Sequence, residues 1–119
     1  MNDPLHRLTL LKERGYVEID LVLLEFMTRY ADTAIKWDIV TFFGANPFSR
    51  DVARNLAGRI GRRETAVSRE LEDLALLGLL QRSRLGDTTV YYLSEKPESR
   101  EMLTRFDAAS RHAEETGRS

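Results

Sequence analysis

The stretch NLAGRIGRRETAVSRELEDLALLGLL, residues 55–80, decides the fold of this 119-residue chain. Up to Gly78 its apolar residues recur every three to four positions, which is the spacing of one face of a helix. Gly61 and Gly78 stand where two such helices should end, because glycine adopts the left-handed conformation of a helix C-terminus without steric cost. We therefore predict a short helix ending at Ile60, a tight turn, and a second helix over residues 64–77.

Two helix starts are expected upstream of this stretch. Ser49 is the predicted N-cap of the short helix, which then spans residues 50–60, and Asp32 is the predicted N-cap of a helix over residues 33–44. The pair Asn46-Pro47 separates the two helices, because the residue before a proline is disfavoured in the helical conformation. The earlier helix is expected to turn inward a stripe of Ile35, Ile39 and Phe42/Phe43, flanked by Trp37 and Val40.

The N-terminal residues bear on how the chain assembles. Residues 16–31 predict a helix whose apolar side chains cover nearly its whole circumference, and residues 1–15 predict a short helix or a partly ordered arm. A helix that is apolar on all sides has to be covered on all sides, which a domain of this size rarely achieves alone. A second copy of the chain is the simplest cover, so we expect a homodimer.

Beyond Gly78 the apolar period changes from 3.6 to 2, which indicates strands. Residues 79–84 and 88–93 are expected to pair as a hairpin, because β-forming side chains dominate the second segment and Gly86 suits the turn between them. The hairpin is the only β-structure that the pattern predicts.

A last helix is expected over residues 97–113, with Pro97 in its first turn and one apolar stripe. The predicted fold class is therefore mainly α with a small β-hairpin (α+β). We expect a single domain over residues 1–119, with residues 33–93 as its core and residues 16–31 and 97–113 as the dimer interface.

Charge is unevenly distributed along the chain. The net charge is −1, yet residues 50–84 carry eight arginines against five acidic residues, a local balance of +3. Residues 1–49 and 85–119 are each at −2. Arginine binds phosphate and guanine through two parallel hydrogen bonds, so residues 50–84 are the candidate region for binding nucleic acid.

Composition also argues against several classes of function. The absence of cysteine excludes disulfides, thiolate metal sites and a cysteine nucleophile. No glycine-rich phosphate loop, nucleophile elbow or metal motif is present, so we expect no enzymatic activity, no cofactor and no metal. No signal peptide and no apolar run long enough to span a membrane is present, which predicts a cytoplasmic protein.

The helix over residues 64–77 has two distinct faces. On a helical wheel Val67, Leu71 and Leu74 form one compact apolar stripe, which should face the core. The opposite face holds Thr65, Arg69 and, if the turn continues the helix, Arg62, with Ala66 at its border and Ser68 at its edge. A short helix that braces a second helix, which enters the DNA major groove by its N-terminal half, is the arrangement of a helix-turn-helix.

Three short motifs carry a resemblance to a known group of proteins. NLAGRIG (55–61), TAVSREL (65–71) and LGLL (77–80) resemble the winged helix-turn-helix regulators of the ArsR and MarR type, and Tyr91-Tyr92-Leu93 resembles the second strand of their wing. The resemblance covers residues 35–93, about half of the chain, and is more specific for the fold than for either family. It implies a winged helix-turn-helix with extra N- and C-terminal helices.

The resemblance also implies a function. It predicts a dimeric transcriptional regulator whose recognition helix, residues 64–77, reads the major groove of double-stranded DNA. The wing, residues 79–93, is then expected on the DNA backbone or in the minor groove. The resemblance assigns Thr65, Ala66, Ser68 and Arg69 to the groove and places Arg82 and Arg84 in the wing. With Arg62 and Arg63 before the recognition helix, these are the candidate DNA-binding residues.

The chain departs from these relatives at the start of the recognition helix. Regulators of this type usually have a hydrophobic residue at position 62 and Ser or Thr at position 63, whereas here both are arginine. The recognition helix therefore lacks its usual cap, which costs ~1 kcal/mol of local stability. The two arginines instead place two positive charges at the N-terminus of the recognition helix, where they suit contact with phosphate.

Other interpretations stay open. A winged helix can serve as a protein–protein interaction module without binding DNA, and an apolar ligand between the terminal helices is also compatible with the pattern. Arg50 and Arg54 are weaker candidates for phosphate contact. The acids Glu70, Glu72 and Asp73 crowd a basic helix, and we expect them to pair with Arg69 or with the wing.

Overall fold

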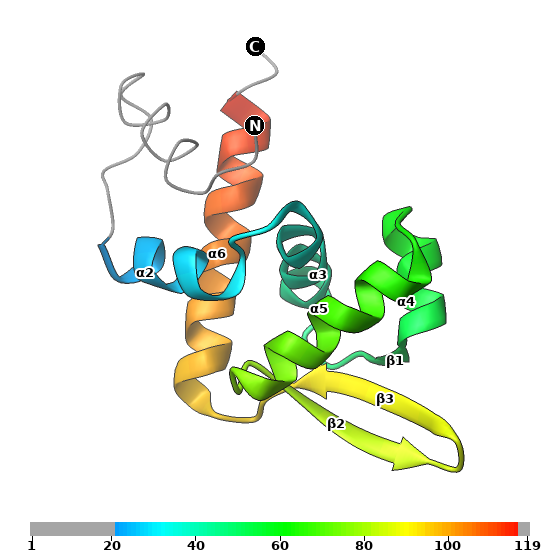
Figure 1. Ribbon diagram of the computed structural model, residues 1–119. Helices are drawn as coiled ribbons and strands as arrows, with labels where there is room; N and C mark the ends of the chain where they lie inside the picture. The colour runs from blue at the N-terminus through cyan, green and yellow to red at the C-terminus, as the bar shows by residue number, and fades with distance from the viewer. Residues whose placement is uncertain (1–20, 117–119) are drawn as a thin grey trace.

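The computed structural model describes residues 21–116 of the chain (Figure 1). The elements follow one another as α2 (Leu21–Tyr30), α3 (Ala34–Ala45), β1 (Arg50–Val52), α4 (Ala53–Ile60), α5 (Glu64–Leu76), β2 (Leu80–Leu85), β3 (Thr88–Leu93) and α6 (Pro97–Thr116). The arm predicted at residues 1–15 and the start of the helix predicted at residues 16–31 lie outside the described residues. α6 continues to Thr116, three residues beyond its predicted end.

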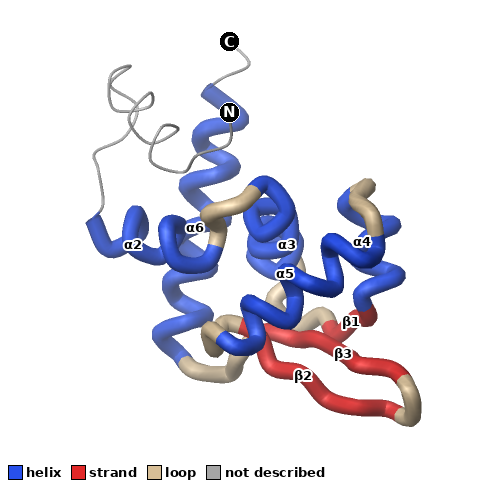
Figure 2. Tube along the Cα trace, viewed as in Figure 1, coloured by secondary structure: helices blue, strands red, loops and turns tan. Residues whose placement is uncertain are grey.

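The helices and the sheet form a winged helix-turn-helix flanked by terminal helices. α3, α4 and α5 pack on one another and on an antiparallel sheet of order β1-β3-β2. The β2–β3 hairpin extends beyond the helices at one end of the molecule, while α2 and α6 lie against α3 at the other (Figure 2). The predicted class, mainly α with a small hairpin (α+β), is confirmed, and a third strand is added to it.

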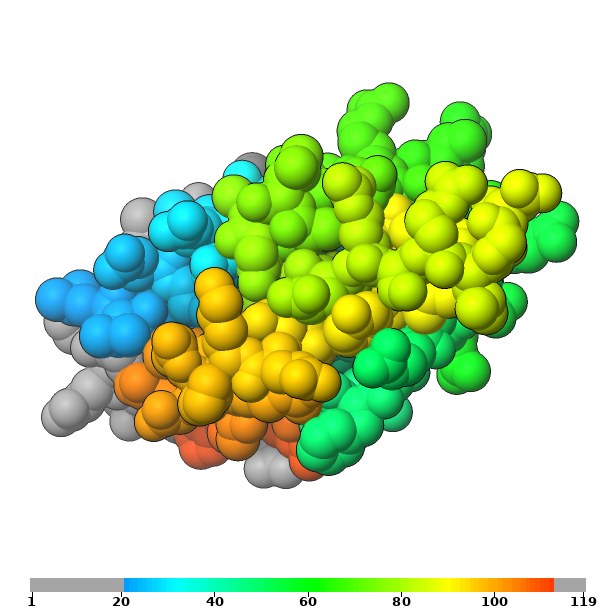
Figure 3. All heavy atoms as spheres, turned by 90° about the horizontal axis from the view of Figure 1, so that it is seen from below, coloured from blue at the N-terminus to red at the C-terminus, as the bar shows by residue number. Residues whose placement is uncertain are grey.

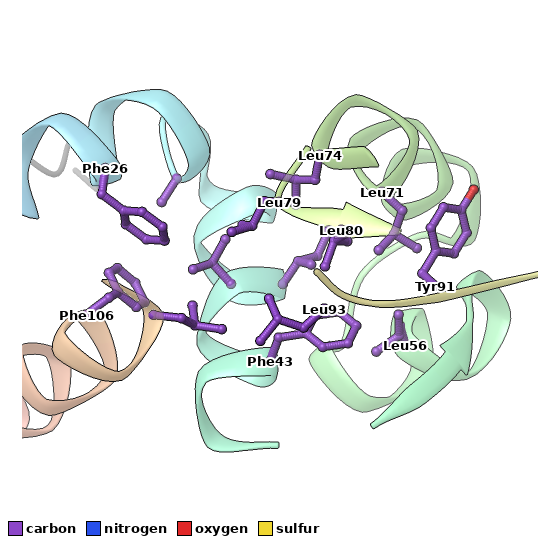
Figure 4. Packing of buried hydrophobic residues seen from close by; sticks show 14 of the residues in the cluster. Phe26, Phe43, Leu56, Leu71, Leu74, Leu79, Leu80, Tyr91, Leu93 and Phe106 are labelled. Carbon is purple, nitrogen blue, oxygen red and sulfur yellow. The ribbon is translucent and has the colours of Figure 1, made fainter. Parts of the chain in front are cut away.

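A single hydrophobic core extends from the winged helix-turn-helix to the terminal helices α2 and α6. In Figure 4, Phe43 of α3, Leu56 of α4, and Leu71 and Leu74 of α5 converge with residues of the sheet. Val67, Leu71 and Leu74 are each 0 % exposed, which confirms the predicted inward stripe of α5. Each fully buried leucine contributes about 1.5–3 kcal/mol relative to an exposed one, so this stripe holds α5 in place.

Both predicted glycine stops are confirmed. Gly61 has φ 69° and Gly78 has φ 88°, the left-handed conformation that ends a helix. After α5 the N–H of Leu79 donates to the carbonyl of Leu74 (3.1 Å), and the N–H of Gly78 donates to the carbonyl of Ala75 (3.1 Å). This pair of hydrogen bonds satisfies two of the last carbonyls of the helix and turns the chain sharply into β2.

The predicted start of the short helix at Arg50 is wrong. Residues 50–52 are a strand, β1, and Ser49 does not cap α4, whose N-cap is Val52 without a side-chain hydrogen bond. β1 pairs with β3 through Arg50↔Tyr92, Asp51↔Tyr91 and Val52↔Val90. The partner strand lies about forty residues away in the chain, so local periodicity could not reveal this pairing.

The predicted N-cap of the helix after Tyr30 is also wrong by one residue. Thr33, not Asp32, caps α3, because its hydroxyl accepts the Lys36 N–H at 3.1 Å. Asp32 instead pairs with the side chain of Lys36, at 3.4 Å. α3 turns Ile39, Val40 and Phe43 fully inward. The prediction that Val40 lies on the flank of the stripe is therefore wrong, because Val40 belongs to the core.

Two glycine-to-alanine substitutions should have opposite effects on stability. Gly58 lies inside α4 and a Cβ there meets no heavy atom within 4 Å, so Gly58→Ala should stabilise the protein by about 0.5–1 kcal/mol. Gly78→Ala should destabilise it by about 1 kcal/mol, since φ 88° is strained for any residue with a Cβ. Urea unfolding of both variants checks the pair. Equal shifts in one direction would show that backbone conformation does not control these sites.

Candidate nucleic-acid interface

α5 presents a polar surface opposite its buried stripe. Thr65 and Arg69 are exposed, whereas Ala66 and Ser68 are half-buried on the flanks. Arg63 is the N-cap residue and makes no side-chain capping bond, as predicted from the missing Ser or Thr. The N-terminal half of α5 therefore carries free backbone N–H groups next to exposed cations, a combination that attracts anions.

Three of the predicted arginines carry unneutralised charge. Arg63, Arg69 and Arg84 are exposed, and none of them forms an ion pair with another residue of the described range 21–116. Arg84 shares a face of β2 with Arg82, because alternate residues of a strand point to the same side. Since Arg82 reaches α5, Arg84 also lies on the side of the wing that faces α5.

Arg62 is held by an acid of α3. Its Nε and Nη2 atoms both lie 2.8 Å from Oδ2 of Asp38. Arg62 stands in the turn before α5 and not on the helix, so the wheel position that assumed a continuous helix does not apply. The contact braces the turn between α4 and α5 against α3.

The wing is fastened to α5 through Glu72. Arg82 donates from Nη1 to both carboxylate oxygens of Glu72 (2.7 and 2.6 Å), and the hydroxyl of Tyr91 donates to Oε2 (2.8 Å). The predicted pairing of an α5 acid with the wing is thus confirmed for Glu72. Glu70 and Asp73 instead contact α3, and Arg69 pairs with none of the three acids.

These contacts shift the pKa values of Glu72 and Tyr91. The hydrogen bonds from Tyr91 and Arg82 hold the pKa of Glu72 below its ordinary value. Burial, reinforced by the hydrogen bond to Glu72, raises the pKa of Tyr91 to about 12. At neutral pH the carboxylate is therefore charged and the phenol protonated, which is the combination that the contact needs.

Glu72→Gln should lower the free energy of unfolding modestly at pH 7 and progressively less at acid pH. Because the pKa of Glu72 is lowered on folding, its stabilisation is present above the unfolded pKa and is lost as pH falls through the folded pKa. With the Glu72 side chain 44 % exposed, solvent screening limits the effect to less than about 1 kcal/mol. Urea unfolding of both proteins at pH 7 and pH 3 measures it, and a difference that grows toward pH 3 would contradict the assignment.

Arg50 does not belong to the surface around α5. Tyr91 points toward α5, so its neighbour Tyr92 and the paired Arg50 face the other side of the sheet, where the Arg50 guanidinium lies 4.1 Å from the centroid of the Tyr92 ring. This underside, seen in Figure 3, contains a hollow of about 110 Å³ lined by residues 47–50, 92, 93, 95 and 100. Arg54, in contrast, is exposed on the first turn of α4 and lies 4.0 Å from Glu64.

The sequence pattern did not predict the residues that hold α5 against α3 and against the wing. Tyr91 was predicted only as a strand residue, and Thr33 and Lys36 of α3 were not predicted to touch α5. The one signal in the sequence was the lysine among the apolar residues of α3, because a charge on that face requires a partner.

Comparison with solved structures places this architecture among known folds. The chain is similar to the AntR antimony-specific transcriptional repressor (TM-score 0.61, 21% identity, covering 80% of this chain and 79% of that one). It is similar to reduced HlyU from Vibrio cholerae N16961 (TM-score 0.56, 21% identity, 75% and 85% covered). It is also similar to a possible transcriptional regulator from Methanosarcina mazei Go1 (TM-score 0.57, 18% identity, 78% and 83% covered).

At these identities the similarity establishes the fold. No protein-family profile and no curated protein sequence matches the chain. The molecule is a winged helix-turn-helix protein, built like structures described as transcriptional regulators. Within residues 21–116, no helix is both long and apolar enough to cross a membrane.

Proposed function

We propose that this protein is a transcriptional regulator that binds double-stranded DNA, with α5 in the major groove and the wing on the backbone or in the minor groove. The observation that carries this proposal is the exposed face of α5, where Thr65 and Arg69 stand opposite a fully buried stripe. Arg69 is available for DNA because it has no ion-pair partner within the described residues. The wing places Arg84 on the same side of the molecule.

The candidate residues divide by the contacts they already make. Arg69, with Thr65, Ala66 and Ser68 around it, is assigned to base edges or nearby phosphates. Arg63 and Arg84, which are exposed and unpaired among residues 21–116, are assigned to phosphate. Arg62 and Arg82 are already paired with Asp38 and Glu72, so they contact phosphate only by sharing their remaining N–H groups.

We further propose a homodimer built from residues 16–31 and 97–113, around the winged core of residues 33–93. Two observations support it. α2 packs on α6, and Leu21 and Val22 of α2 are 73% and 57% exposed. A two-fold dimer would present two copies of α5 to successive major grooves, about 34–36 Å apart on DNA.

A second candidate function is protein–protein interaction without DNA binding. Its support is the pairing of Arg62 with Asp38 and of Arg82 with Glu72, which removes positive charge from the surface around α5. An interaction module has no need of unpaired cations near the recognition helix, whereas a DNA-binding protein does.

Selection from random duplex DNA, followed by titration at 50 and 200 mM salt, distinguishes the two functions. A DNA-binding dimer should enrich a palindromic site, and its log affinity should fall with log salt by about 0.9 for each phosphate contacted. If no duplex binds at 50 mM salt up to tens of micromolar protein, the DNA-binding proposal is overturned in favour of the interaction module.

A further inference from the structure

Two polar contacts join the first turn of α3 to the recognition helix. The Thr33 hydroxyl donates to Oε2 of Glu70 at 2.7 Å, and the Lys36 ammonium donates to Oδ2 of Asp73. The contacts join Thr33 to Glu70 and Lys36 to Asp73, residues that are three apart on each helix. Residues three apart lie on the same face of a helix, one turn from each other. The two contacts therefore hold α5 against α3 at two successive heights.

Lys36 is the buried member of this set. Its side chain is 8% exposed, whereas those of Asp73 and Asp32 are 44% and 50% exposed. Burial of the ammonium acts to lower the pKa of Lys36, but the hydrogen bond to Asp73 and the nearby carboxylates of Asp32 and Glu70 raise it above its ordinary value. Lys36 thus stays charged and bridges two carboxylates from different parts of the fold.

Those two carboxylates belong to different parts of the molecule, one next to the terminal helices and the other on the recognition helix. Asp32 stands at the corner between α2 and α3, 3.4 Å from the Lys36 ammonium, and Asp73 stands on α5. α2 packs on α6 in the terminal half, whereas α5 carries the exposed face of the winged half (Figure 1). The Lys36 ammonium is therefore a charged link between the two halves.

Such a link can control how α5 is rotated about its own axis. The buried stripe of α5 is held by apolar contacts, which are non-directional, whereas a hydrogen-bonded ion pair is directional. Arg69 directly precedes Glu70 and so lies about 100° from it around the helix. A rotation of 10° moves an atom 5–6 Å from the axis by about 1 Å, which exceeds the ~0.5 Å to which binding groups must be held.

We propose that Lys36 is a positioning residue for DNA readout, which sets the rotation of α5 by bridging Asp32 at the α2–α3 corner and Asp73 on the recognition helix. The inference rests on the proposed DNA-binding function. It assigns sequence discrimination partly to a buried residue that faces α3 and α5 and not the DNA. It also makes the α2–α3 corner the place where the arrangement of the terminal helices reaches the recognition helix.

The test compares Lys36→Met and Asp73→Asn with a matched control, Arg59→Met. Arg59 pairs with Asp51 at 3.4 Å and lies 5.8 Å from the centroid of the Phe42 ring, so its replacement removes the same charge and two contacts, neither of them with α5. For each variant we measure affinity for the selected duplex, affinity for a scrambled duplex, and the melting temperature. Lys36→Met and Asp73→Asn should lower the ratio of selected to scrambled affinity by roughly two- to thirtyfold. Arg59→Met should leave this ratio unchanged.

The outcomes separate a positioning role from a purely structural one. A lower melting temperature with an unchanged ratio in both Lys36→Met and Asp73→Asn would show that Lys36 only stabilises the fold, and the inference would be wrong. The Lys36→Met, Asp73→Asn double variant should lower the ratio no further than either single change, because each single change already breaks the Lys36–Asp73 contact. If Lys36→Met does not fold, Asp73→Asn decides alone. If the wild-type protein itself selects no sequence, the DNA-binding function fails and this inference fails with it.

Discussion

Arg69→Ala should lower affinity for the selected duplex by roughly 5- to 150-fold, or about 1–3 kcal/mol, the value of one good base contact. Arg69 projects from the exposed face of α5, opposite the buried stripe, and forms no ion pair with any other described residue. Its loss therefore removes no hydrogen bond or ion pair that the described residues make with one another. The expected effect is on binding and not on stability, and fluorescence anisotropy with labelled duplexes measures it.

The comparison with Arg84→Ala makes the test specific. Arg84 lies on the wing and is assigned to phosphate, so its loss should weaken binding to selected and scrambled duplexes alike and reduce the salt slope by about one. Arg69→Ala should instead change the preferred sequence. If Arg69→Ala weakens both duplexes equally, Arg69 contacts phosphate only. If it changes neither affinity, Arg69 does not belong to the interface.

Leu71→Ala should destabilise the protein by about 2–5 kcal/mol, which is the range for truncating a fully buried leucine. Leu71 is 0 % exposed at the centre of the α5 stripe, where it packs among residues of α4 and the sheet (Figure 4). Single domains are stable by only about 5–15 kcal/mol, so the variant should lose a large part of its stability. Because the stripe holds the recognition helix, DNA binding should fall with the folded fraction.

Leu76→Ala is the matched control on the same helix. Leu76 is 76% exposed, so its truncation should change stability by less than about 0.5 kcal/mol. Urea unfolding monitored by circular dichroism measures both variants. Similar losses for Leu71→Ala and Leu76→Ala would contradict the division of α5 into one buried and one exposed face. They would also weaken the assignment of the exposed face to DNA.

The recognition helix could be predicted well because its signals are local. The 3.6-residue period identified Val67, Leu71 and Leu74 as the core stripe, and all three are fully buried. Gly61 and Gly78 end their helices at positive φ, as their places after the apolar pattern indicated. Helix periodicity and C-terminal glycines depend on residues within one or two turns, so a single sequence contains them.

One error arose where a distant segment competes with a local signal. Residues 50–52 read as the start of a helix, yet they pair with β3, because a sheet hydrogen bond satisfies their backbone groups as well as a helix turn would. The other error arose between neighbours in the chain, because Asp32 and Thr33 are both good N-caps. Thr33 became the cap of α3, and Asp32 was drawn to the Lys36 side chain instead.

By itself the sequence determined a short helix, a turn, a recognition helix and a hairpin, together with the face of α5 that is exposed. Only the tertiary structure decided which of the arginines on and around α5 form ion pairs within the described residues. Among the eight arginines between residues 50 and 84, packing pairs Arg62 with Asp38 and Arg82 with Glu72 and leaves Arg69 unpaired among the described residues. The physical reason is the separation along the chain over which each interaction acts. Helix propensity acts between near neighbours, whereas an ion pair forms between whichever charges the fold brings within a few ångströms.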